Sequence, residues 1–120
     1  MEQTNTEPVI LIVEDDAIIA LDLKTMLHRF SFRAAGPVVR GEDVIPFLQD
    51  HQVDMVLMDI LLDGNVDGIE AASMVMNLFD VPVVFTTAQS DDMTIKRASE
   101  VSPYGFIVKP YNDREIYGTI

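Results

Sequence analysis

The sequence predicts an α/β fold, a three-layer sandwich in which a parallel sheet of five strands has helices on both faces. Short apolar runs alternate five times with segments whose apolar residues recur every three or four positions, and these patterns are typical of buried strands and of helices. Strict alternation favours a parallel sheet, because parallel strands need crossover connections. The length of 120 residues, of which 48% are hydrophobic, suits one domain with one core.

The first strand and helix follow a polar segment. Residues 1–8 (MEQTNTEP) carry no apolar period, so we expect a flexible tail there and a domain that spans residues 9–120. Val9–Val13 (VILIV) is a continuous, mostly β-branched run and predicts a strand. Ala17–Phe30 predicts a helix, because its apolar residues recur every three or four positions: Ile19, Leu23, Leu27 and Phe30.

Two further strand–helix units make up the middle of the chain. Arg33–Val38 predicts the second strand, and Gly41–His51 predicts the second helix. Val53–Met58 (VDMVLM) predicts the third strand, which ends at Asp59. The third helix is entered through Asp67-Gly68, and its apolar stripe consists of Ile69, Ala72, Met76 and Phe79.

The last two units are shorter. Val81–Phe85 (VPVVF) predicts the fourth strand, in which Pro82 fits only near the start. Asp91–Glu100 predicts a polar helix and Tyr104–Val108 (YGFIV) the fifth strand. Asn112–Ile120 begins a final helix, with Asn112 as its N-cap.

The composition limits the partners of this chain. The formal net charge is −12, which argues against direct binding of nucleic acid and suits a divalent cation or a basic protein surface. The sequence has no cysteine, no apolar run of the roughly 18 residues that a membrane span needs and no amino-terminal signal pattern. We therefore expect no thiolate metal site, no membrane insertion and a cytoplasmic location.

Polar side chains follow four of the five predicted strands. The carboxyl ends of parallel strands lie at one edge of the sheet, where open α/β sheets bind their ligands. Each residue has an ordinary explanation by itself, as a helix cap, a turn residue, a β-former or a surface charge. Together, at one edge, they indicate a functional site. They are Glu14, Asp15 and Asp16 after the first strand, Asp59 after the third, Thr86 and Thr87 after the fourth, and Lys109 after the fifth.

One chemistry uses all of these residue types. Acids from the first and third strands can hold a hard cation such as Mg²⁺ or Mn²⁺, which cancels the repulsion between them. An aspartate can also attack phosphorus and form an aspartyl phosphate. The Lys109 ammonium and the Thr87 hydroxyl can each take one phosphoryl oxygen. Asp16 is most simply the acid at the start of the following helix.

This ordered set resembles the receiver domain of two-component response regulators, the CheY-like family, from about Val9 to the end of the chain. The resemblance implies a flavodoxin-like (βα)5 fold with strand order 2-1-3-4-5. The matching motifs are VEDD at Val13–Asp16, MD at Asp59, DG at Asp67-Gly68, TTA at Thr86–Ala88 and IVKPY at Ile107–Tyr111.

The resemblance also implies a role for each site residue. Asp59 is the phosphoryl acceptor. Asp15 is the main metal carboxylate and Glu14 a direct or water-mediated ligand, with Asp59 and the backbone carbonyl of Leu61 as further ligands. Lys109 matches the lysine of the family pattern.

Three further positions have switch or turn roles by the same resemblance. Thr87 is the switch hydroxyl, preferred over Thr86 because it directly precedes Ala88. Phe106 lies where the family places a switch aromatic, although a purely structural role in the core is the alternative. Pro110 implies a cis peptide bond between it and the preceding lysine.

The chain departs from the family in two places. The stretch Asp59–Gly68 (DILLDGNVDG) lacks the usual proline and is one residue longer, and Asp63 within it is more simply a solvated loop acid than a site residue. This loop and the SPYGFIVKPY stretch resemble receivers joined to sensor kinases or PAS-containing chains. The final helix has only about nine residues, so we expect a truncated helix, from a larger response regulator, a hybrid sensor kinase or a short stand-alone receiver.

These features predict a signalling switch rather than a conventional enzyme. A phosphohistidine on a histidine kinase or phosphotransfer protein would donate its phosphoryl group to Asp59 with Mg²⁺ bound, and the domain would catalyse its own dephosphorylation. Phosphorylation would reshape the face formed by the fourth helix, the fifth strand and the fifth helix. A downstream effector domain or protein would read that face, and a homodimer is a further possible assembly.

The alternatives come from other functional classes. A non-phosphorylated pseudo-receiver that acts as a docking module would lack site residues, and none of the main ones is missing. A phosphatase of the haloacid-dehalogenase kind would carry its nucleophile in an Asp-x-Asp pattern after the first strand, and Glu14–Asp16 does not fit that pattern with its expected threonine spacing. No glycine-rich loop of a flavin or dinucleotide binder follows this strand.

Overall fold

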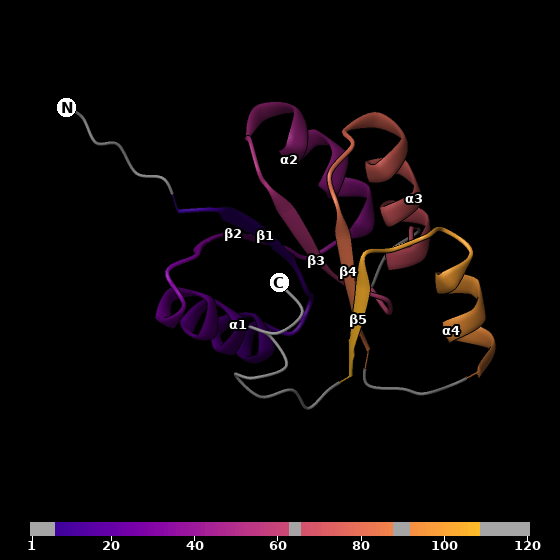
Figure 1. Cartoon of the computed structure of the whole chain (residues 1–120), viewed down its shortest axis with the longest axis horizontal. Coiled ribbons are helices and arrows are strands. Elements are labelled where there is room, and N and C mark those ends of the chain that lie inside the picture. The colour runs from indigo at the N-terminus through magenta and orange to yellow at the C-terminus, as the bar shows by residue number, and fades with distance from the viewer. Residues whose placement is uncertain (1–6, 63–65, 88–91, 109–120) are drawn as a thin grey trace.

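The structure, a computed structural model, describes residues 7–62, 66–87 and 92–108 and contains a five-stranded parallel sheet in the order β2-β1-β3-β4-β5 (Figure 1). This order confirms the prediction. The elements are β1 (Val9–Val13), α1 (Ala17–Arg29), β2 (Arg33–Val38), the 3₁₀ turn η1 (Gly41–Asp43), α2 (Val44–Asp50), β3 (Met55–Asp59), α3 (Gly68–Leu78), β4 (Val83–Thr87), α4 (Asp92–Ser99) and β5 (Gly105–Val108).

The described helices cover both faces of the sheet, so the three layers are confirmed. Helix α1 lies on one face, and α2, α3 and α4 lie on the other (Figure 1). Alternate residues of β1 divide between the two cores: Ile10 and Ile12 pack towards α1, whereas Leu11 and Val13 pack towards the opposite helices. The sheet is thus buried on both sides, which explains why its strands read as continuous apolar runs.

The predicted helical stripes are buried in the expected order. In α1, Leu23 and Leu27 are fully buried and Ile19 is half-buried. In α3, Ile69 and Ala72 are buried, whereas the last members of the stripe, near the helix end, are half-buried. The spacing of apolar residues therefore identified the faces of these helices correctly.

The bounds of β3 and β4 differ from those predicted. Strand β3 begins at Met55 rather than Val53, because Asp54 binds the start of β1 through both its backbone N–H and its side chain. Strand β4 is Val83–Thr87 rather than Val81–Phe85, because its two threonines continue the ladder: Thr86 pairs with Asp59 and Thr87 pairs with Val108. A β-branched threonine suits a buried strand end as well as an apolar residue does.

Smaller differences concern the helix ends and the start of β5. The predicted helix over Gly41–His51 starts with the turn η1 and becomes α-helical only from Val44. The fourth helix is described from Asp92 to Ser99, and β5 begins at Gly105. The predicted final helix, Asn112–Ile120, lies outside the described residues. Within the ranges that are described, no helix is long and apolar enough to cross a membrane.

Candidate functional site

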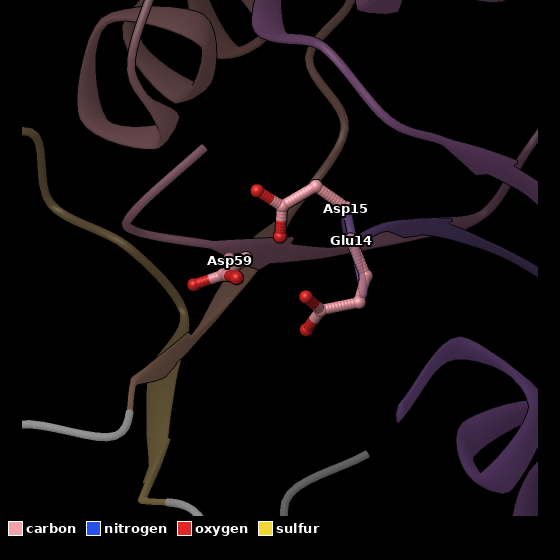
Figure 2. Close-up of side chains that lie close together, drawn as sticks. All are labelled: Glu14, Asp15 and Asp59. Carbon is pink, nitrogen blue, oxygen red and sulfur yellow. The ribbon is translucent and has the colours of Figure 1, made fainter. Parts of the chain in front are cut away.

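Three carboxylates meet at the carboxyl edge of the sheet. Glu14 and Asp15 directly follow β1, and Asp59 is the last residue of β3. The two strands are neighbours, with Val13 paired to Met58, so their ends lie side by side. Figure 2 shows the three side chains reaching into a common space. One carboxylate oxygen from each lies within 4.8 Å of the others.

The depth of the three side chains differs. Glu14 is 2% exposed and Asp59 is 6% exposed, whereas Asp15 is half-buried and lies nearer the solvent. Like charges this close, in a partly buried site, repel one another unless a cation lies among them. The close grouping of these three acids therefore favours a cation at this edge of the sheet.

The donor set fits a hard divalent cation. Mg²⁺ prefers oxygen ligands, is bound by few carboxylates and retains several waters. Two deep carboxylates and a half-buried one offer such oxygens within 4.8 Å of one another. These oxygen donors are in keeping with the predicted Mg²⁺. A thiolate-bound metal was not expected, because the sequence contains no cysteine.

The two deep carboxylates are oriented in the same way. Glu14 accepts a hydrogen bond from the backbone N–H of Asp16 at 3.1 Å, and Asp59 Oδ1 accepts one from the N–H of Leu61 at 3.1 Å. In each case the donor lies two residues further along the chain, which for Asp59 is the pattern of an Asx turn. The backbone of the loop after each strand thus fixes the direction of the carboxylate at the strand end.

Asp16 has a different role, as the sequence indicated. Its Oδ1 accepts hydrogen bonds from the N–H groups of Ile18 and Ile19, at 2.9 and 3.2 Å, which makes it the N-cap of α1. An N-cap aspartate satisfies backbone donors that have no partner within the helix. The acidic run after β1 is therefore divided: two acids face the site and the third starts the helix.

The loop after Asp59 returns close to the strand from which it leaves. The N–H of Gly68 donates to the carbonyl of Ile60 at 3.0 Å, and a Cβ built on Gly68 would lie only 2.0 Å from the carbonyl oxygen of Asp59. Only glycine lets α3 begin against the backbone of the acceptor candidate. The pair Asp67-Gly68 was predicted as a helix entrance, but this close approach was not.

The threonines of β4 lie at the same edge. Thr86 and Thr87 are both buried, and Thr86 is the direct neighbour of Asp59 in the parallel register. Thr87 lies one residue further along, opposite Val108. The choice of Thr87 over Thr86 as the switch hydroxyl stays a prediction.

The predicted roles of Phe106 and Leu61 stay predictions. Phe106 is half-buried, packs against the core beneath α2–α4 and has its ring centroid 5.8 Å from that of Phe85. The Leu61 side chain is 60% exposed, which is compatible with a residue that acts through its backbone. The predicted Lys109, its cis peptide bond to Pro110, and Asp63 lie outside the described residues.

Comparison with known proteins gives a consistent result. The model of the response regulator receiver domain matches residues 10–120. The transcriptional regulatory protein PdtaR of Mycobacterium tuberculosis is 31% identical over 111 residues, which make up 92% of this chain and 54% of that protein. The chain thus spans about half the length of this curated relative.

Solved structures show the same fold. The signal receiver domain of a modulated diguanylate cyclase from Desulfovibrio desulfuricans G20 is 31% identical, with a TM-score of 0.89 over 94% of this chain and 90% of that one. The receiver domain of the sensor histidine kinase PA1611 from Pseudomonas aeruginosa, solved with a magnesium ion in its active site cleft, has a TM-score of 0.83 over 94% and 93% of the two chains. At 22% identity it supports the fold alone.

Proposed function

Because the chain belongs to the response regulator receiver domain family, we propose that it is a phosphorylation-dependent signalling switch that accepts a phosphoryl group on Asp59. The observation that carries this proposal is the convergence of Glu14, Asp15 and Asp59 within 4.8 Å at the carboxyl edge of the sheet. Asp59 has its carboxylate held by the N–H of Leu61, which orients it as a nucleophile.

The transfer is a displacement at phosphorus. An Asp59 carboxylate oxygen bonds to the phosphorus of a phosphohistidine on a histidine kinase or phosphotransfer protein, and the P–N bond breaks. The electron pair of that bond stays on the donor imidazole. The product is an aspartyl phosphate, which water later hydrolyses back to the carboxylate and inorganic phosphate.

A magnesium ion, held by Asp15, Asp59, the Leu61 carbonyl and directly or through water by Glu14, would neutralise charge on the transferring phosphoryl oxygens. Lys109 and the Thr87 hydroxyl take two further phosphoryl oxygens in this proposal. The new charge of about −1.5 to −2 then biases the face of α4, β5 and the following segment, which an effector reads. Manganese, which also accepts oxygen ligands, can replace magnesium.

The proposal is tested by incubating the protein with Mg²⁺ and a small phosphodonor and measuring its intact mass. We expect the wild type to gain one phosphoryl group, and Asp59→Asn to gain none. Asp80→Asn is a matched control: Asp80 is exposed at the end of α3 with a φ of 53°, a conformation that asparagine also adopts readily. The proposal fails if the wild type stays unmodified or if Asp59→Asn is modified equally well.

Magnesium binding separates this proposal from a docking module that is not phosphorylated. In an NMR titration with Mg²⁺, we expect the amide signals near Asp15 and Asp59 to shift and those near Asp80 to stay. A protein whose amide signals do not respond to Mg²⁺ would be better described as a pseudo-receiver.

A further inference from the structure

An ion pair joins α4 to the loop that follows the acceptor. The guanidinium of Arg97 lies 3.0 Å from Oδ2 of Asp67, although the two residues are 30 positions apart in the sequence. Arg97 belongs to α4, whereas Asp67 is the N-cap of α3. Helix α4 therefore contacts the base of the β3–α3 loop through this side chain.

Asp67 is fixed on its other side by the first turn of α3. Its Oδ1 accepts a hydrogen bond from the Glu70 N–H at 2.9 Å, and the Glu70 carboxylate accepts one from the Asp67 N–H at 3.3 Å, which completes a capping box. One oxygen of Asp67 thus holds α3 and the other binds Arg97. The Asp67 carboxylate therefore links Arg97 directly to the first turn of α3.

Gly68, which follows Asp67 in the chain, contacts the backbone next to the acidic site. Its backbone approaches the Asp59 carbonyl so closely that not even a methyl group fits between them, and its N–H is bonded to Ile60. The Asp59 side chain in turn accepts a hydrogen bond from the Leu61 N–H. A short covalent and hydrogen-bonded path therefore runs from the ion pair to the groups proposed to bind the cation.

We propose that Arg97 is a positioning residue for the acidic site, which holds the base of the β3–α3 loop so that Asp59 and the Leu61 backbone are pre-organised for a divalent cation. This inference rests on the magnesium site proposed above. The side chains of Arg97 and Asp67 are 55% and 32% exposed, so the effect is modest. Exposed pairs of this kind correspond to a change of about 1.5- to 5-fold in an equilibrium constant, and loss of pre-organisation weakens binding.

Two substitutions distinguish positioning from a simple effect of charge on Mg²⁺ affinity. Arg97→Gln removes a positive charge, which by itself would tighten binding of a cation. Asp67→Asn removes a negative charge, which would weaken it, and asparagine remains a good N-cap. Positioning predicts that both variants bind Mg²⁺ more weakly than the wild type, because both break the same contact.

The affinity is measured by NMR titration with Mg²⁺ in about 0.15 M salt, where the screening length is about 8 Å and distant charge effects are reduced. We expect each single variant to bind about 1.5- to 5-fold more weakly, the double variant to bind no more weakly than the weaker single one, and Arg97→Lys to recover most of the loss. Lys96→Gln removes the same charge from the adjacent exposed position of α4 and should not weaken binding. The inference is overturned if Arg97→Gln behaves like Lys96→Gln, or if the two losses add.

A second measurement needs no metal. The Gly68 amide, which donates to Ile60, should exchange its hydrogen faster in Arg97→Gln and Asp67→Asn than in the wild type, and at the wild-type rate in Lys96→Gln. If the wild type does not bind Mg²⁺, the proposed function fails, and the inference that Arg97 positions Asp59 for a cation fails with it. If Mg²⁺ binds but Gly68 exchange is unchanged in both variants, the positioning role alone is overturned.

Discussion

Two aspartates flank the same strand, and the fold gives them opposite surroundings. Asp54 precedes β3, is exposed, and accepts a hydrogen bond of 2.7 Å from the Val9 N–H at the start of β1. Asp59 ends β3, is 6% exposed, and lies within 4.8 Å of two other acids. The residue type is the same, so the end of the strand decides whether the carboxylate completes the sheet or gathers with like charges.

The difference follows from the direction of a parallel sheet. At the amino edge, a strand that is just beginning offers a backbone N–H, and Asp54 joins β1 to β3 by accepting it. At the carboxyl edge, the loops after β1 and β3 supply one N–H each, to Glu14 and to Asp59. Those bonds orient the carboxylates, and the grouping of three acids makes this edge suited to a cation.

The largest expected effect is on the glycine that supports Asp59. In Gly68→Ala, the added methyl group would meet the Asp59 carbonyl at 2.0 Å, so the backbone of β3 or the start of α3 must move. We expect a loss of about 3 kcal/mol in the free energy of unfolding, as for a badly overpacked site, measured by urea denaturation. Asn77→Ala on the exposed part of the same helix should be slightly stabilising, because alanine is the better helix former.

In metal-free buffer, neutralising Asp59 and neutralising Asp54 should change the free energy of unfolding in opposite directions. Two carboxylates with oxygens within 4.8 Å of one another repel by a few kcal/mol at an effective dielectric constant of about 20. Asp59→Asn should therefore raise the free energy of unfolding by about 1–3 kcal/mol. Asp54→Asn should lower it by about 0.5 kcal/mol, because its bond to Val9 loses the carboxylate charge.

Mg²⁺ should then offset the advantage in the free energy of unfolding that Asp59→Asn has over the wild type in metal-free buffer. A ligand present at about 100 times its dissociation constant stabilises the folded state by about 2.7 kcal/mol. We expect this gain for the wild type and for Asp54→Asn, and a much smaller one for Asp59→Asn, in thermal unfolding with and without Mg²⁺. Equal gains for all three proteins would place the cation away from Asp59.

The sequence predicted the helical faces and the acids at the strand ends, because these depend on local periodicity and on where polar residues interrupt it. The strand order was predicted only through the resemblance to receiver domains, because periodicity within a strand does not specify its neighbours in the sheet. The sequence did not predict that Thr86 and Thr87 lie inside β4, since a polar β-branched residue reads equally well as a strand end or as a loop. The pair between Asp67 and Arg97 was also missed. It depends on the packing of α4 relative to α3, which no pattern within either segment specifies.

The smallest effect concerns Asp16, which shares the acidic run with Glu14 and Asp15 but caps α1. Asp16→Ala should lower the free energy of unfolding by about 1 kcal/mol, because the N–H groups of Ile18 and Ile19 lose their acceptor, and Asp16→Asn by only a few tenths. Both variants should bind Mg²⁺ within about twofold of the wild type, since the charge removed is exposed and screened. A tenfold loss of Mg²⁺ affinity in Asp16→Asn, with stability kept, would instead make all three acids of the run part of the cation site.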